Sequence, residues 1–143
     1  MRFDNICEKH VVIFGDSNTF GYNPADDGRY DSKTRYPCLL AYYLGDKWRV
    51  YEEGLSGRTS VFDDPFTEGL SGIDSITPVL MTHAPVDRLI IMLGTNDTKS
   101  RFGSSASLSA KGLKRLTQKA INTDCWRSYP DIILVCPPPI DPA

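Results

Sequence analysis

The sequence alternates short, β-rich apolar runs with segments that have the character of helices. The apolar runs predict strands at about residues 10–14, 48–52, 87–93 and 131–136. Between them, the pattern predicts helices at about residues 37–44, 70–81 and 107–121. Strands that alternate with helices are typical of a parallel sheet covered on both faces. We therefore predict an α/β fold, a three-layer α/β/α sandwich in which residues 1–143 form a single domain.

Polar turns follow the predicted strands. Gly15-Asp16-Ser17-Asn18 comes directly after the first strand, and Gly94-Thr95-Asn96-Asp97 comes after the third. The second strand leads into a loop at residues 54–59, which contains Gly57. The carboxyl ends of parallel strands meet at one edge of the sheet, where α/β folds bind ligands. We expect Ser17, Gly57 and Asn96 to converge at that edge.

These residue types favour nucleophilic catalysis. A serine hydroxyl is a weak nucleophile that needs a base to take its proton and donors to hold the oxyanion. The backbone N–H groups of Ser17 and Gly57 and the side-chain amide of Asn96 could supply those donors. A glycine at position 57 would let the backbone come close to a substrate. The pattern predicts Ser17 as the nucleophile, with an oxyanion hole formed by Ser17, Gly57 and Asn96.

With these motifs the chain resembles the SGNH, or GDSL-type, hydrolases. Gly15-Asp16-Ser17-Asn18 matches the first block of that family, Gly57 rather than Gly54 the second, and the turn at 94–97 the third. The segments that look most like the arylesterase and acyltransferase branch are residues 52–59, 63–65, 90–99 and 137–139. The resemblance covers almost the whole chain. It implies a flavodoxin-like parallel sheet with strand order 2-1-3-4 and hydrolysis of small carboxylic esters through an acyl-serine, without metal or cofactor.

Three further residues beside these turns are candidates for the site. Asp16 and Asp97 are expected to support it, and Phe20 is a candidate for lining an acyl pocket. Arg58 could bind an acidic group of a substrate, but its closeness to Asp63 and Asp64 predicts that it ties down its own loop.

No residue in the pattern supplies the base. The resemblance implies an Asp-x-x-His block after a fifth strand, whereas the sequence reaches Ala143 just past the fourth predicted strand. Its only histidines, His10 and His83, are predicted at the amino edge of the sheet in structural or solvated roles. We therefore expect weak turnover. We also expect an exposed edge at residues 132–135, which favours a homo-oligomer.

Composition excludes several classes of function. Apolar residues make up 41% of the chain and the net charge is -2, which gives no electrostatic case for nucleic acid. No apolar run approaches the length needed to cross a membrane, and the amino terminus does not resemble a signal peptide. The four cysteines form no C-x-x-C pair, which argues against zinc. We expect a cytoplasmic protein with reduced thiols, and Cys136 as a small buried residue.

Two other readings compete with an esterase. The first is a catalytically silent SGNH-like domain that binds esters or acyl groups, or that only self-associates. The second is a flavodoxin-like nucleotide binder. The sequence has neither a Walker A lysine motif nor G-x-G-x-x-G, which weighs against the second.

Overall fold

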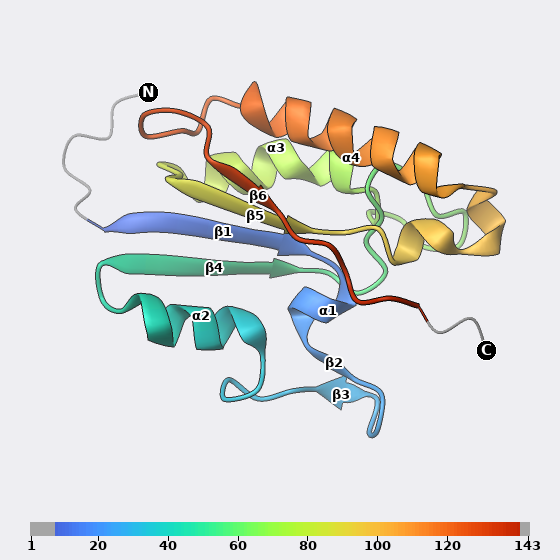
Figure 1. The fold of residues 1–143 in the computed structure, drawn as a ribbon, viewed down its shortest axis with the longest axis horizontal. Coiled ribbons are helices and arrows are strands. Elements are labelled where there is room, and N and C mark those ends of the chain that lie inside the picture. The colour runs from blue at the N-terminus through green and yellow to red at the C-terminus, as the bar shows by residue number, and fades with distance from the viewer. Residues whose placement is uncertain (1–7, 141–143) are drawn as a thin grey trace.

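The computed structural model describes residues 8–140 and shows a parallel sheet between two layers of helices (Figure 1). The sheet consists of β1 (Lys9–Gly15), β4 (Trp48–Gly54), β5 (Arg88–Met92) and β6 (Ile132–Leu134). Its strand order is β4-β1-β5-β6, with every pair parallel. This is the predicted order 2-1-3-4, and the predicted α/β class is confirmed.

The central strand β1 sets where the site forms. Its residues Val11 to Phe14 are at most 1% exposed, because strands lie on both sides and helices cover both faces. Gly15 pairs with Gly54 of β4 and with Met92 of β5. The three strands therefore end at the same level, and the chain leaves all of them at one edge of the sheet.

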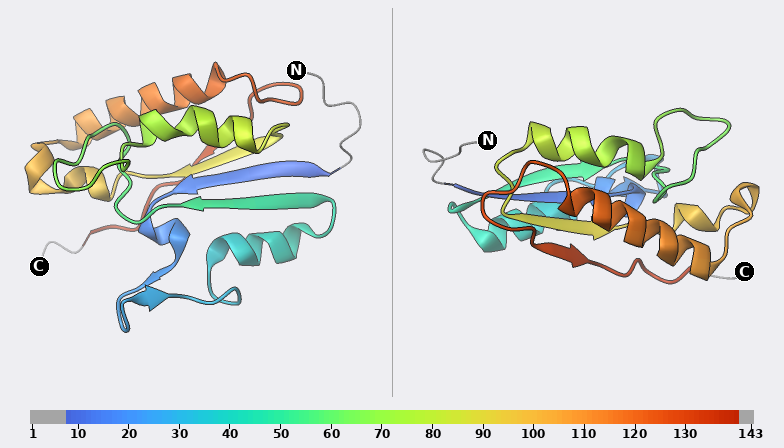
Figure 2. Two further views of the ribbon diagram at one scale, coloured as in Figure 1. Left: turned by 180° about the vertical axis from the view of Figure 1, so that it is seen from behind. Right: turned by 90° about the horizontal axis from the view of Figure 1, so that it is seen from above.

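Helices α3 (Gly72–Thr82) and α4 (Ala106–Ile121) pack against one face of the sheet. Helix α2 (Tyr36–Leu44) and the short α1 (Ser17–Phe20) lie on the other face, as Figure 2 shows from two further directions. The three predicted long helices are thus confirmed within a few residues at their ends. The main core lies between the sheet and α3 and α4, with Phe14, Ile76, Leu80, Leu89, Ile91 and Leu116 among its fully buried members.

The segment 19–36, for which the hydrophobic pattern predicts no strand or helix, contains short regular elements. Helix α1 occupies its start, and β2 (Tyr22–Asn23) pairs antiparallel with β3 (Gly28–Arg29). Two single-turn 3₁₀ helices, η1 (Asn96–Thr98) and η2 (Ser100–Phe102), follow β5. These elements are too short to produce a hydrophobic period, so local hydrogen bonds and tertiary contacts decide them.

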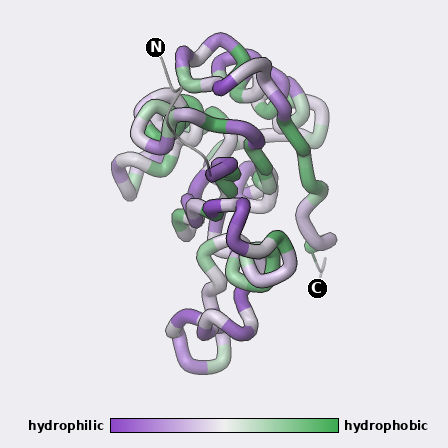
Figure 3. Tube along the Cα trace, turned by 90° about the vertical axis from the view of Figure 1, so that its left-hand side faces the viewer, coloured by the Kyte–Doolittle hydropathy of each residue, from purple (hydrophilic) through white to green (hydrophobic). Residues whose placement is uncertain are grey.

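Strand β6 lies at one edge of the sheet and is hydrogen-bonded only to β5 within residues 8–140. Ile133, Leu134 and Val135 are 40%, 54% and 39% exposed. The hydrophobic stretch that runs toward the C-terminal end along one side of the molecule is visible in Figure 3. Cys136 follows this strand and is exposed, so the prediction that it is buried is wrong. Within the described part of the chain, no helix is both long and apolar enough to cross a bilayer.

Candidate active site

The candidate site lies where β1, β4 and β5 end. Asp16 and Ser17 follow β1, Gly57 lies in the loop after β4, and Asn96 and Asp97 form the first turn after β5. The sheet order places β1 between the other two strands. The three segments named from the sequence therefore leave neighbouring strands at one edge.

Asp16 shapes the turn that carries Ser17. Its carboxylate accepts a hydrogen bond from the Asn18 backbone N–H at 2.9 Å, which caps the start of α1. Its carbonyl accepts from the N–H groups of Thr19 and Phe20. Asp16 is fully buried, and this burial raises the pKa of its carboxyl despite the opposing hydrogen bonds from Asn18. Ser17 is the first residue of α1 and is half-buried.

Asn96 joins the three segments. Its side-chain Nδ2 donates to the Arg58 carbonyl at 3.1 Å and reaches the Asp16 carboxylate at 3.4 Å. Those partners are the chain neighbours of Gly57 and Ser17, and Asn96 is only 8% exposed. The structure thus holds the Asn96 amide beside both turns. Whether Ser17, Gly57 and Asn96 act together as an oxyanion hole stays a prediction.

Gly54 at the end of β4 and Gly57 in the loop beyond it have different reasons to be glycine. Gly57 has φ = +87°, a conformation that costs an L side chain energy. Gly54 packs against α1, and a Cβ there would lie 2.2 Å from the Phe20 backbone nitrogen. Gly54 is therefore needed to seat the turn of Ser17 against β4, and Gly57 to turn the loop beyond it.

Asp97 is a buried anchor for the surrounding loops. Its carboxylate accepts from the Ser60 backbone N–H at 2.8 Å and from the hydroxyls of Ser60 and Ser109, both at 2.6 Å. It thereby ties the turn after β5 to the loop after β4 and to α4. Sequence reasoning named Asp97 as supporting but missed Ser60 and Ser109, because isolated serines in polar segments give no signal of a shared partner.

Arg58 does not tie down its own loop as predicted. It is 5% exposed, and its Nη1 donates to the carbonyls of Gly15 at 3.2 Å and Glu53 at 2.5 Å. The aspartate Asp64 instead pairs with Arg101 at 2.5 Å. The prediction was wrong because closeness in sequence does not reveal that the arginine turns back toward the strand ends.

Both histidines are held by other groups. His83 Nε2 lies 2.6 Å from a Glu53 carboxylate oxygen, and its ring stacks on Tyr51. His10 is 7% exposed, and its Nδ1 lies 2.9 Å from the His83 carbonyl oxygen. This is the structural role expected for them, and neither is hydrogen-bonded to Ser17. Glu53, which the sequence did not single out, is the carboxylate partner of His83.

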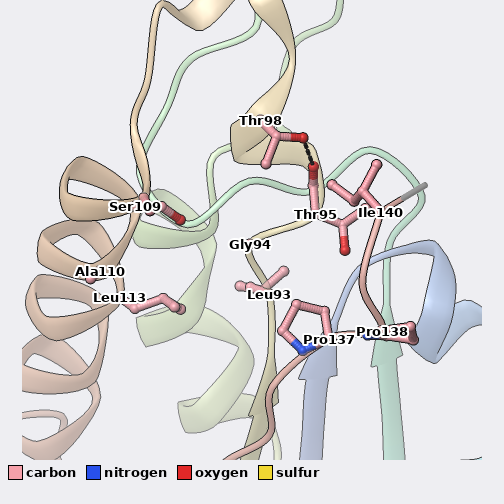
Figure 4. A pocket seen from close by; sticks show the side chains of 11 residues that line it. Leu93, Gly94, Thr95, Thr98, Ser109, Ala110, Leu113, Pro137, Pro138 and Ile140 are labelled. Atoms are coloured by element: carbon pink, nitrogen blue, oxygen red, sulfur yellow. Dashed lines mark hydrogen bonds between the residues drawn. The ribbon is translucent and has the colours of Figure 1, made fainter. Parts of the chain in front are cut away.

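An apolar cavity of about 350 Å³ adjoins the turn after β5, between the start of α4 and the segment after β6 (Figure 4). Its lining includes Leu93, Thr95, Ala110, Leu113, Pro137 and Ile140. Phe20 is not among the lining residues, and its ring lies 4.3 Å from the Arg29 guanidinium instead. Thr95 is the chain neighbour of Asn96, but none of Ser17, Gly57 and Asn96 lines this cavity. A role for Phe20 in acyl binding stays a prediction.

The fold and these strand-end turns are those of an SGNH-type α/β hydrolase. The model of the GDSL-like lipase/acylhydrolase family matches residues 13–143, and the chain belongs to that family. The resemblance stated from the sequence is confirmed. A comparison with curated proteins found no match.

Several solved structures similar to this chain are esterases by their titles. A carbohydrate acetylesterase family member from Sinorhizobium meliloti is 37% identical, with a TM-score of 0.88, covering 93% of this chain and 64% of its own. The inhibitor-bound aryl esterase of M. smegmatis is 38% identical, with a TM-score of 0.84, covering 94% and 66%. Est24, a carbohydrate acetylesterase from Sinorhizobium meliloti, is 36% identical, with a TM-score of 0.83 and the same coverage of 94% and 66%. The chain thus spans about two thirds of the length of these proteins.

Proposed function

We propose that this chain is a serine esterase whose substrates are small carboxylic esters. Each ester transfers its acyl group to Ser17. The observation that carries the proposal is the Asn96 amide, which is held between Asp16 and Arg58 beside the exposed turn of Ser17. Family membership and similarity to aryl esterases and carbohydrate acetylesterases support the same chemistry.

In this proposal, Ser17 Oγ attacks the ester carbonyl carbon and gives its proton to water, because both histidines are engaged with other groups. The tetrahedral intermediate then breaks its bond to the alcohol oxygen, which takes a proton from water as the alcohol leaves. The negative charge on the carbonyl oxygen is held by the N–H groups of Ser17 and Gly57 and by Asn96 Nδ2, whose N–H toward Asp16 exchanges that long 3.4 Å contact for the oxyanion. Water or a second alcohol then releases the acyl group, so hydrolysis and acyl transfer share the same intermediate. Asp16 and Asp97 hold the turns that carry these groups.

We propose that turnover by this chain is slow, because both of its histidines are engaged elsewhere. An oxyanion hole and binding alone leave about 10³–10⁴-fold acceleration over water in serine proteases stripped of their triad. The same observation favours the second candidate function, a silent domain that binds esters without reacting.

Acylation by p-nitrophenyl acetate distinguishes the two candidates. The esterase proposal expects release of p-nitrophenol and an acetyl group on Ser17 by mass spectrometry, and neither with Ser17→Ala. A fluorophosphonate probe should label the same residue. Equal p-nitrophenol release by the chain and by Ser17→Ala, with no adduct on Ser17, would refute the esterase and leave the silent domain.

We also propose that the protein acts in the cytoplasm as a homo-oligomer. The three described cysteines, Cys38, Cys125 and Cys136, are free thiols, which suits a reducing compartment. The apolar edge at β6 supports association of copies. Cell fractionation and light scattering test these two points separately.

A further inference from the structure

Arg58 stands out because its charged side chain is buried at the point where two strands end. One nitrogen of its guanidinium, Nη1, donates to the carbonyls of Gly15 and Glu53. Gly15 is the last residue of β1, and Glu53 is the second-to-last residue of β4. Gly15 immediately precedes Asp16 and Ser17. The side chain therefore fixes the end of the nucleophile strand relative to its neighbour β4.

The backbone of Arg58 reaches the other two segments of the site. Its N–H donates to the Leu55 carbonyl at 3.0 Å, which closes the turn that holds Gly57. Its carbonyl accepts from Asn96 Nδ2 at 3.1 Å. One residue thus contacts the segments that carry Ser17, Gly57 and Asn96.

The surroundings of the guanidinium are costly for a residue that only stabilises the fold. The group lies 4.0 Å from the Phe14 ring, and its buried Nε has no hydrogen-bond partner among the described residues. Burial lowers the pKa of Arg58 to about 10, although the Glu53 and Asp16 carboxylates oppose this, so the group stays positively charged at neutral pH. A buried charge with an unpartnered N–H costs free energy, so an arginine that served the fold alone would hold these two carbonyls inefficiently. A fixed positive charge close to the site would stabilise an oxyanion.

We propose that Arg58 is a positioning residue for ester cleavage, which clamps the ends of β1 and β4 so that the donors on Ser17, Gly57 and Asn96 face one oxyanion. This inference rests on the proposed function. It predicts that Arg58 acts on the rate of acylation rather than on substrate binding, because it touches the backbone of the site and not the substrate.

The test compares Arg58→Met, which removes the charge and both bonds, with Arg58→Lys, which keeps the charge on a different geometry. Arg49→Met is the matched control, since Arg49 is an exposed arginine near the start of β4, the opposite end of that strand from Arg58. Single-turnover acylation by p-nitrophenyl acetate gives the maximal rate and the half-saturating concentration for each variant. Circular dichroism and thermal melting establish that each variant is folded.

We expect Arg58→Met to lower the maximal acylation rate about 100-fold, as misplacement of a catalytic group does, with the half-saturating concentration changed by less than about threefold. Arg58→Lys should recover about tenfold of that loss, and Arg49→Met should match the unchanged chain. A folded Arg58→Met with a rate within about threefold of the unchanged chain would overturn the proposal. So would a loss confined to the half-saturating concentration, because that result assigns Arg58 to substrate binding.

If Arg58→Met does not fold, the acylation rate and half-saturating concentration of Arg58→Lys are judged by the same threefold limits. If neither variant folds, the proposal is overturned in favour of a purely structural role for Arg58. A readout that does not need activity separates this inference from the proposed function. In ¹H–¹⁵N spectra, the amides of Ser17 and Gly57 and the side-chain amide of Asn96 should shift in Arg58→Met and stay in place in Arg49→Met. Unmoved signals refute the clamp, whereas acylation that persists in Ser17→Ala refutes the esterase.

Discussion

Replacing Asn96 with alanine removes a buried amide from the centre of the candidate site. In the structure this amide donates to the Arg58 carbonyl at 3.1 Å and reaches the Asp16 carboxylate at 3.4 Å. The substitution therefore has two separable effects. It deletes a proposed oxyanion donor, and it leaves a buried carbonyl and a buried carboxylate without their shared partner.

The two effects have different sizes. Loss of one oxyanion-hole donor lowers kcat by about 10²–10³-fold in a serine hydrolase, so we expect Ser17 acylation by p-nitrophenyl acetate to slow by that factor. A buried group left without its partner costs about 1–3 kcal/mol, so the free energy of unfolding should fall by that amount. The rate effect should exceed what the lost stability explains, since the variant remains largely folded at 25 °C.

The assay is the p-nitrophenol burst at stoichiometric protein, with urea unfolding of the same samples. Asn122→Ala serves as the control, because Asn122 is an exposed asparagine at the end of α4, away from the site. An Asn96→Ala protein that is destabilised as expected but acylates within about threefold of the unchanged chain would refute a role for Asn96 as an oxyanion donor.

Three further predictions follow from particular contacts. Burial raises the pKa of Asp16 above 3.8, so its ionisation on going from acid to neutral pH removes stability from the folded chain. The unfolding free energy of Asp16→Asn minus that of the unchanged chain should therefore increase as pH rises from 3.8 toward neutrality, and a flat or falling difference in urea titrations would contradict this. Gly54→Ala should cost about 3 kcal/mol, as overpacking does, because its Cβ meets backbone of Phe20. Gly45→Ala, at φ = +74° but with no atom within 4 Å of its Cβ, should cost only about 1 kcal/mol, and equal losses would show that packing of α1 is not the cause. Leu134 lies on the edge strand and is 54% exposed, so Leu134→Lys should weaken self-association measured by light scattering over a concentration series. Equal association of the variant and the unchanged chain, or monomers at every concentration for both, would exclude β6 as the contact.

Much of the fold was predictable because it depends on patterns repeated over many residues. The four strands and three long helices follow from apolar runs and helical spacing, and alternation of the two dictates a parallel sheet. The turns at Gly15-Asp16-Ser17-Asn18 and Gly94-Thr95-Asn96-Asp97 were placed at one edge by the same logic, since parallel strands share the direction in which they end. The short elements between residues 19 and 36 escaped prediction, because single turns of helix and two-residue strands leave no period to detect.

The sequence by itself determined which chemical groups reach the carboxyl edge of the sheet, because strands that alternate with helices run parallel and end at the same edge, while the strand order followed from the family resemblance. Only the tertiary structure decided how those groups are held. It turned Arg58 toward the carbonyls of Gly15 and Glu53, gave Asp97 its three donors and paired His83 with Glu53. It also left Cys136 exposed beside the edge strand, where a hydrophobic run alone predicts burial. Hydrogen bonds between residues far apart in the chain depend on distances of a few tenths of an ångström, and such distances are set by packing of the whole domain rather than by any segment of it.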